Sequence, residues 1–170
     1  TSGPAMTKSG LLDYVYRGPD APWKTLGQMI RKGHRVVMLA DNDKAVDPLW
    51  YRPTYDGLMQ ETPYTFNPPS LLTDPANWHK SCRPNRGDTT GSLFLMNHWS
   101  PSIAPPVPNP DNSNAVNAYD VIAGRATTCA EVRGRYPNII AADQVGDGGL
   151  FDAVADLNRL PAATIHPPGT

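Results

Sequence analysis

Apolar residues recur along this chain in short runs that end abruptly in polar residues. Residues 35–41, 92–99 and 139–143 form the clearest runs, and their length and composition are typical of buried β-strands. A weaker strand is predicted within residues 56–66, ending at or before Pro63. The chain therefore carries at least four candidate strands, each followed by polar residues.

Helical spacing of apolar residues predicts helices over residues 23–32, 114–124, 128–135 and 150–160. Residues 67–90 contain four prolines and a Gly-Asp pair and are predicted to form a loop. The residues expected on the apolar helix faces include Leu26, Ile30, Tyr119 and Phe151. Helices that alternate with short apolar strands indicate an α/β fold.

Composition and charge narrow the class of protein. The 170 residues include 19 prolines and 14 glycines, a surplus that long ordered loops must carry. The chain has 15 basic and 16 acidic residues, so its net charge is −1. This excludes binding to nucleic acid or to an anionic membrane through overall charge, although not through a local basic patch. The longest apolar run, residues 36–40, is far shorter than the roughly 20 residues of a membrane span. The chain is also shorter than the roughly 250 residues of a complete eight-stranded α/β barrel.

Each predicted strand ends at a residue that is able to carry chemistry: Asp41, Glu61, His98 and Asp143. In parallel α/β folds the site lies at the carboxyl ends of the strands, so these side chains are expected around one rim. They could act as general acid and base, or bind an oxygen-preferring cation. Alternatively, polar residues here simply mark where each strand reaches the surface. No serine-nucleophile, phosphate-loop or zinc-protease motif occurs.

The two cysteines, Cys82 and Cys129, leave two interpretations open. They are either two buried thiols or one disulfide, and a disulfide would imply an oxidising compartment. A bridge would close a loop of about 47 residues, worth roughly 4 kcal/mol in the chain-entropy model. Because no Cys-x-x-Cys motif is present, a zinc ribbon or a thioredoxin-like motif has no support.

Several motifs occur in the order and spacing of a known enzyme family. Residues 23–30 and then 33–38 match a W-x-T-L-x-E-M-I…G-x-R-V-V-V-F stretch, and residues 61–64 match an E-T-P-F/Y segment. Residues 93–98 match an L-F/Y-L-M/L-N-H strand, and residues 137–143 match an R-P-N-F-I-x-x-D strand. Together the motifs resemble the phosphatidylinositol-specific phospholipase C superfamily. The branch they resemble is that of secreted bacterial and fungal PLC-like phosphodiesterases with TIM-barrel folds.

The resemblance implies a TIM-barrel-type (β/α)8 fold, of which this chain supplies roughly the last four βα units. Residues 1–22 would form a lead-in segment, residues 23–160 the C-terminal half of the barrel, and residues 161–170 a loosely ordered tail. The family's catalytic histidines lie on the early strands, and none of the four histidines here matches their motifs. The expected partner is therefore the missing N-terminal half-barrel, either covalently joined or a separate chain.

The resemblance also implies a mechanism. In the family, one histidine takes a proton from the inositol 2-hydroxyl, which attacks the phosphodiester, and a second histidine protonates the leaving diacylglycerol oxygen. An arginine or Ca²⁺ stabilises the transition state. Asp143 is similar in position to the aspartate that orients the first histidine, so it is the expected catalytic residue of this chain. Asp41, Glu61, Asn97 and His98 are expected to contact the substrate.

The expected function is that of a secreted phosphodiesterase that cleaves a phospholipid or a glycerol phosphodiester when complete, this chain alone being inactive. The family implies a disulfide between Cys82 and Cys129. We expect this chain to require no cofactor, and none of its residues is assigned as a metal ligand, although Ca²⁺ is a possible cofactor. We expect neither a nucleic-acid partner nor a transmembrane segment. Two alternatives stay open: a non-catalytic barrel that binds lipid headgroups or glycans, and a metal-dependent glycerophosphodiester phosphodiesterase.

Overall fold

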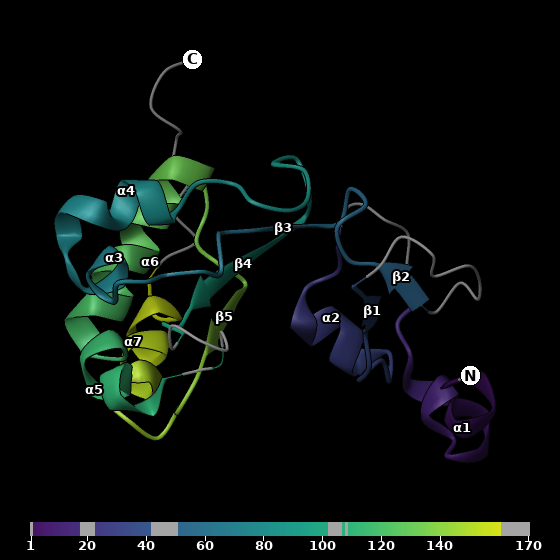
Figure 1. Ribbon diagram of the computed structural model, residues 1–170. Helices are drawn as coiled ribbons and strands as arrows, with labels where there is room; N and C mark the ends of the chain where they lie inside the picture. The colour runs from purple at the N-terminus through teal and green to yellow at the C-terminus, as the bar shows by residue number, and fades with distance from the viewer. Residues whose placement is uncertain (1, 18–22, 42–50, 102–106, 108, 161–170) are drawn as a thin grey trace.

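The fold is built from short strands and helices that follow one another along the chain (Figure 1). A computed structural model describes residues 2–17, 23–41, 51–101, 107 and 109–160. The elements in chain order are α1 (Ser2–Lys8), η1 (Leu11–Tyr14), α2 (Leu26–Arg31), β1 (Met38–Ala40), β2 (Tyr51–Pro53), β3 (Met59–Glu61), α3 (Ser70–Thr73), η2 (Pro75–Asn77), α4 (Trp78–Ser81), β4 (Leu93–His98), η3 (Pro110–Asn112), α5 (Ser113–Val116), α6 (Tyr119–Arg133), β5 (Ile139–Ala142) and α7 (Leu150–Leu157). The predicted tail, residues 161–170, lies outside the described residues.

The strands form two parallel sheets. β1 pairs with β2, with Met38 beside Tyr51, and the second sheet has the strand order β3-β4-β5, with Leu95 beside Ile139. The predicted α/β fold with parallel strands is therefore confirmed. Within the described ranges the two sheets do not join into a closed barrel.

The main core lies between the three-stranded sheet and helices α6 and α7, which cover one face of it (Figure 1). Because side chains alternate along a strand, Phe94 and Met96 of β4 point to the same face. There they pack against Ala126 of α6 and against Cys82 and Cys129, which form a disulfide with their Cα atoms 4.9 Å apart. The disulfide implied by the family resemblance is therefore confirmed.

The two edges of the three-stranded sheet differ. The outer edge of β3 is occupied by the chain itself, because the Glu61 amide donates to the Arg86 carbonyl and the Asn85 amide donates to the Glu61 carbonyl, both at 2.9 Å. Gly87 follows with a φ of +80°, and a Cβ there would lie 1.8 Å from the Met59 carbonyl oxygen, so this close crossing requires glycine. At the opposite edge, β5 pairs with β4 alone among the described strands.

The N-terminal part has a small core of its own. Met6 and Val15 pack with Val36, Met38 and Tyr51, and a parallel bridge joins Val15 to Val36. The predicted buried strand over residues 35–41 is therefore only partly correct. The strand covers Met38–Ala40, and Val37 is 39% exposed because it points away from this core.

Three further expectations needed correction. The predicted loop 67–90 contains α3, η2 and α4, and Asp74 caps η2 by accepting from the Ala76 amide at 3.0 Å. The two predicted helices over 114–124 and 128–135 are instead α5 and a longer α6, which are separated at Asn117 and the extended Ala118. The third correction concerns side chains that were expected to face the core but lie at the surface: Leu26, Ile30, Tyr119 and Phe151. None of the helices in the described ranges combines the length and the apolar content that crossing a membrane requires.

Candidate functional site

The carboxylate of Glu61 lies at the end of β3 and is the centre of a polar cluster. Its Oε1 accepts from Asn85 Nδ2 at 2.9 Å and from Arg86 Nε at 2.6 Å. Its Oε2 accepts from the Tyr55 hydroxyl at 2.9 Å and from Asn97 Nδ2 at 3.2 Å. Burial alone would raise the pKa of Glu61, but the hydrogen bonds from Arg86, Tyr55, Asn97 and Asn85 outweigh it and lower the pKa. Glu61 is therefore ionised at neutral pH and suited to holding other groups rather than to donating a proton.

Arg86 extends this cluster to the first sheet. Its guanidinium binds Glu61, and its Nη1 donates to Asp41 Oδ1 at 2.9 Å, directly after β1. The guanidinium also lies 4.1 Å from the ring centre of Tyr55 and 5.4 Å from that of Tyr64. The hydrogen bond to Glu61 is the main reason that the pKa of Arg86 is raised. Arg86 thus joins the ends of β1 and β3 through two carboxylates.

Asn97 belongs to this cluster, whereas its neighbour His98 does not. Successive residues of a strand point to opposite faces of the sheet, so Asn97 points toward Glu61 and His98 toward helix α6. The His98 side chain is fully buried, with Nε2 2.8 Å from the Val116 carbonyl oxygen and Nδ1 3.1 Å from Arg125 Nη1. Burial and then the Arg125 charge lower the pKa of His98 to about 3, so the ring is neutral. The structure does not place His98 in the cavity expected for it.

Asp143 follows β5 and lies apart from the Glu61 cluster. It lines a small pocket whose other residues are mostly polar: Trp99, Ser100, Asn109, Asn112, Ser113, Val116 and Asn117. Asn117 Nδ2 donates to the Asp143 carbonyl at 2.8 Å and to the Gln144 carbonyl at 3.2 Å. The carboxylate oxygen Oδ2 is buried and has no hydrogen-bond partner within the described part of the chain, and burial raises the pKa of this carboxyl. Of the four residues expected around one rim, the structure joins Asp41 and Glu61 and leaves His98 and Asp143 elsewhere.

The residues that complete the Glu61 cluster were not predicted from sequence. Asn85, Arg86 and Tyr55 come from stretches that carry no strand or helix pattern. Gly87 is only a hint in the sequence, because a glycine allows the chain to cross close to a strand but does not show which strand it crosses.

Among the described residues, the Glu61 cluster offers no free set of carboxylates for Ca²⁺. Within the described residues no group of three or more His, Cys, Asp or Glu side chains is arranged to hold a metal ion. The two carboxylates that do come together, Asp41 and Glu61, already share the Arg86 guanidinium, which is a cation in the position a metal would need.

Comparison with known proteins identifies the family. Residues 2–158 match the PI-PLC X family, described as "PI-PLC X 1". A protein of Arthroderma benhamiae called "PI-PLC X domain-containing protein 1" is 25% identical over 163 residues, which cover 89% of this chain and 51% of that relative. An "Uncharacterized secreted protein" of the same organism is 27% identical over an alignment of 173 positions, and the alignment covers 89% of this chain and 38% of that relative. No solved structure matches.

The chain spans about half of the first of these relatives and less of the second. The family match itself covers nearly the whole chain, including the N-terminal residues that precede α2. This chain therefore belongs to the PI-PLC X domain family.

Proposed function

We propose that this chain is the C-terminal half-barrel of a secreted phosphodiesterase of the phosphatidylinositol phospholipase C type. In this proposal the complete protein cleaves a phospholipid or a glycerol phosphodiester by histidine acid–base chemistry, and the histidines come from outside these 170 residues. Membership of the PI-PLC X family supports the reaction class. The span of 51% of one relative supports the division into halves.

The observation that carries the proposal is the state of Asp143. Its Oδ2 is buried and lacks a partner among the described residues, while the backbone beside it is held by Asn117. A carboxylate in this state suits the orienting member of a His–Asp pair, because it fixes the imidazole tautomer and stabilises the imidazolium. β5, which precedes Asp143, also has an outer edge that no other described strand covers. A strand added there would end beside Asp143 and bring its histidine within reach.

The Glu61 cluster has a separate role in this proposal, which is recognition of the substrate's hydroxyl groups. Glu61 is already occupied by its neighbours, so it acts as the anchor of Arg86 rather than as a ligand. The groups left open are Asp41, whose side chain is 78% exposed, and the exposed ring of Tyr64. A carboxylate next to an aromatic ring offers a hydrogen-bond acceptor and a flat apolar face, which together suit a polyol.

Secretion is part of the proposal for two reasons. The disulfide between Cys82 and Cys129 persists best in an oxidising compartment. One relative is also named as a secreted protein.

The test compares the 170-residue chain alone with the same chain joined to the rest of the protein. We expect the isolated chain to turn over neither phosphatidylinositol nor a glycerophosphodiester, and the joined protein to release a phosphomonoester or a cyclic phosphate. Turnover by material whose mass confirms the 170-residue chain would overturn the proposed division.

A second candidate is ligand binding without catalysis. It is favoured by the mutual neutralisation of Arg86 with Glu61 and Asp41, which suits a binding surface better than proton transfer. A joined protein that binds inositol phosphate but leaves phosphatidylinositol intact would favour this candidate.

A further inference from the structure

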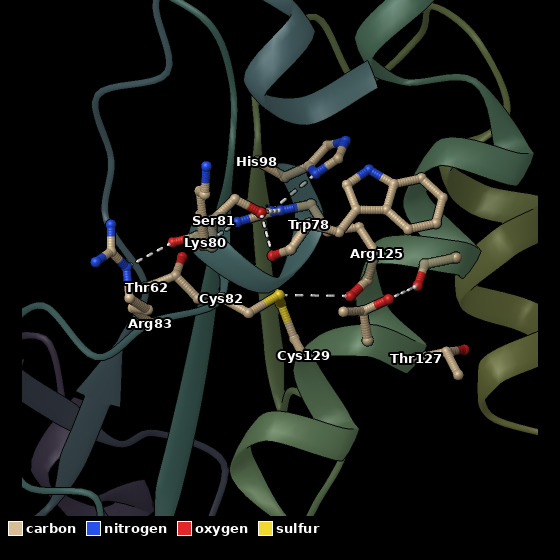
Figure 2. The surroundings of a disulfide bond; sticks show 12 residues. Thr62, Trp78, Lys80, Ser81, Cys82, Arg83, His98, Arg125, Thr127 and Cys129 are labelled. Atoms are coloured by element: carbon tan, nitrogen blue, oxygen red, sulfur yellow. Dashed lines mark hydrogen bonds between the residues drawn. A yellow bond between two sulfur atoms is a disulfide. The ribbon is translucent and has the colours of Figure 1, made fainter. Parts of the chain in front are cut away.

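Arg125 of α6 is a completely buried cation that the function above does not use. Its Nε and Nη2 donate to the Ser81 hydroxyl and carbonyl at 2.8 and 2.9 Å (Figure 2). Its Nη1 donates to the Asn97 carbonyl at 2.7 Å. None of its partners within the described residues is a carboxylate. Burial lowers the pKa of Arg125 to about 9. Because a buried charge without a counter-ion is costly, the contacts that it makes need an explanation.

Arg125 fixes the carboxyl end of β4 from the helical side. Besides the Asn97 carbonyl, its Nη1 reaches His98 Nδ1, and since Nδ1 accepts that bond, Nε2 carries the proton and donates to the Val116 carbonyl. Two consecutive residues of the strand are thereby held to α6. A planar guanidinium, with five donors in a fixed arrangement, suits this task better than the single ammonium of lysine.

The disulfide strengthens the support behind Arg125. Cys129 lies four residues after Arg125, so both side chains project from the same face of α6. Cys129 is bonded to Cys82, while Arg125 binds the adjacent Ser81 (Figure 2). The Ser81–Cys82 pair is therefore attached to α6 twice, and Arg125 is packed between this attachment and β4.

The opposite face of β4 carries the Glu61 cluster. The Asn97 backbone is held by Arg125 on one side of the sheet, and the Asn97 amide donates on the other side to Glu61 Oε2 and, at 2.9 Å, to the Thr62 carbonyl. We propose that Arg125 is a positioning residue, which fixes the end of β4 so that the Asn97 amide holds the Glu61 carboxylate against Arg86. This role concerns the geometry of the site and is independent of whether the protein cleaves phosphodiesters.

Arg133 is a matched control on the same helix. It also donates to a backbone carbonyl, that of Gly91 at 3.0 Å. Its guanidinium lies 5.9 Å from the ring centre of Phe94, as that of Arg125 lies 4.8 Å from the ring centre of Phe66. It contacts β3 through Gln60 Oε1 at 3.0 Å, next to Glu61 in sequence but on the helical face of the sheet. Arg133 therefore serves as the control for an arginine on α6 that only stabilises the fold.

The test uses NMR of the chain labelled with ¹³C at the glutamate carboxyl groups. Only two glutamates occur in the 170 residues, so Glu61 gives one of two signals and Glu131, exposed on α6, gives the reference. We expect Arg125→Met to move the Glu61 titration midpoint upward, because the Asn97 amide no longer stabilises the ionised carboxylate. Arg133→Met should leave the midpoint in place even where it lowers the unfolding temperature.

An unchanged Glu61 midpoint in folded Arg125→Met, or an equal rise in Arg133→Met, would overturn the proposal. If Arg125→Met does not fold, Ser81→Ala takes its place, because it removes the acceptor of Arg125 Nε and leaves the guanidinium present. A smaller upward shift is then expected, and no shift overturns the proposal. Neither readout depends on phosphodiesterase activity, so failure here is distinguishable from failure of the proposed function.

Discussion

Glu61 and Asp143 are two carboxylates that follow strands of the same parallel sheet, and their surroundings are opposite. Glu61 receives hydrogen bonds from Tyr55, Asn85, Arg86 and Asn97, and its pKa is lowered. Asp143 has a buried oxygen without a partner in the described part of the chain, and its pKa is raised. Among the described residues, the Glu61 carboxylate has a full set of partners, whereas the Asp143 carboxylate has an oxygen that none of them reaches.

The backbone shows the same difference. The outer edge of β3, beside Glu61, is paired with the chain's own residues Asn85 and Arg86. The outer edge of β5, which leads to Asp143, is open among the described strands. The closed edge with its saturated carboxylate fits the recognition role that we propose for the Glu61 cluster. The edge of β5 and the unpaired carboxylate of Asp143 are where we propose that the other half of the barrel attaches.

The largest effect is expected from Asp143→Asn in the protein joined to its other half. If Asp143 orients the catalytic histidine, kcat should fall by about 10⁴-fold, because the amide stabilises the wrong tautomer. The free energy of unfolding should not fall, since the substitution removes a buried carboxylate that has no partner among the described residues. Steady-state kinetics and urea unfolding on the same preparation measure the two quantities.

Asn117→Ala is the control for Asp143→Asn. It removes the amide that holds the Asp143 and Gln144 carbonyls but keeps the carboxylate itself. A kcat loss equal to that of Asp143→Asn would show that the loop geometry, and not the carboxylate, carries the effect. A kcat that Asp143→Asn leaves unchanged would remove Asp143 from the mechanism.

Glu61→Gln should show the reverse pattern. The amide keeps the size of the side chain but leaves Arg86 without its buried counter-charge, so we expect a loss of about 2 kcal/mol in the free energy of unfolding. The value is set below that of a fully buried pair because the Arg86 side chain is 41% exposed. Urea unfolding measures the loss, with Glu131→Gln on the surface of α6 as the control. A loss no larger than that of the control would contradict the central position given to Glu61.

Sequence alone identified the parallel strands but not which of their residues meet. Short apolar runs predicted where β4 and β5 lie, because strands of parallel sheets are rich in apolar residues. β3 was predicted only weakly, because two of its three residues, Gln60 and Glu61, are polar. The exposed Leu26 and Phe151 were misplaced, because helical periodicity identifies an apolar face and cannot tell whether a neighbour covers it. α5 and α6 were divided at the wrong residue, because the break depends on Asn117 reaching the carbonyls after β5, a contact 26 residues away in sequence.

For the candidate site, the predictable part was the set of residues that follow the strands. Asp41, Glu61 and Asn97 were named from sequence, and the structure brings them together. His98 was placed beside Asn97, although strand alternation sends neighbours to opposite faces, so this error was avoidable. Arg86 was missed for a different reason: it lies in a loop whose path over β3 is set by the close approach of Gly87, which no local pattern encodes.

Lowering the pH should change the stability contributions of Glu61 and Asp143 in opposite directions. The folded pKa of Glu61 lies below its unfolded value, so its contribution to stability is present above about pH 4.3 and is lost as the pH falls through the folded pKa. The folded pKa of Asp143 lies above its unfolded value, so ionising it costs stability at neutral pH, and acid relieves that cost.

Urea unfolding of the wild type and of both variants between pH 7 and pH 3 measures how each free energy of unfolding depends on pH. Relative to the wild type, Glu61→Gln should lose less stability as the pH falls, and Asp143→Asn should lose more. If the free energies of unfolding of the two variants changed with pH in parallel, the proposed electrostatic difference between the two sites would be wrong.

The smallest effect is expected from Asp41→Asn, which breaks only the outer contact of Arg86. The Asp41 side chain is 78% exposed and that of Arg86 is 41% exposed, so water and salt screen the pair. We expect a loss of about 0.5 kcal/mol in the free energy of unfolding, which disappears in high salt. Asp56→Asn is the control, since Asp56 is exposed and forms no ion pair within the described residues. A loss that approaches that of Glu61→Gln would mean that Arg86 needs both carboxylates, and that the site is completed by both sheets rather than by β3 and β4 alone.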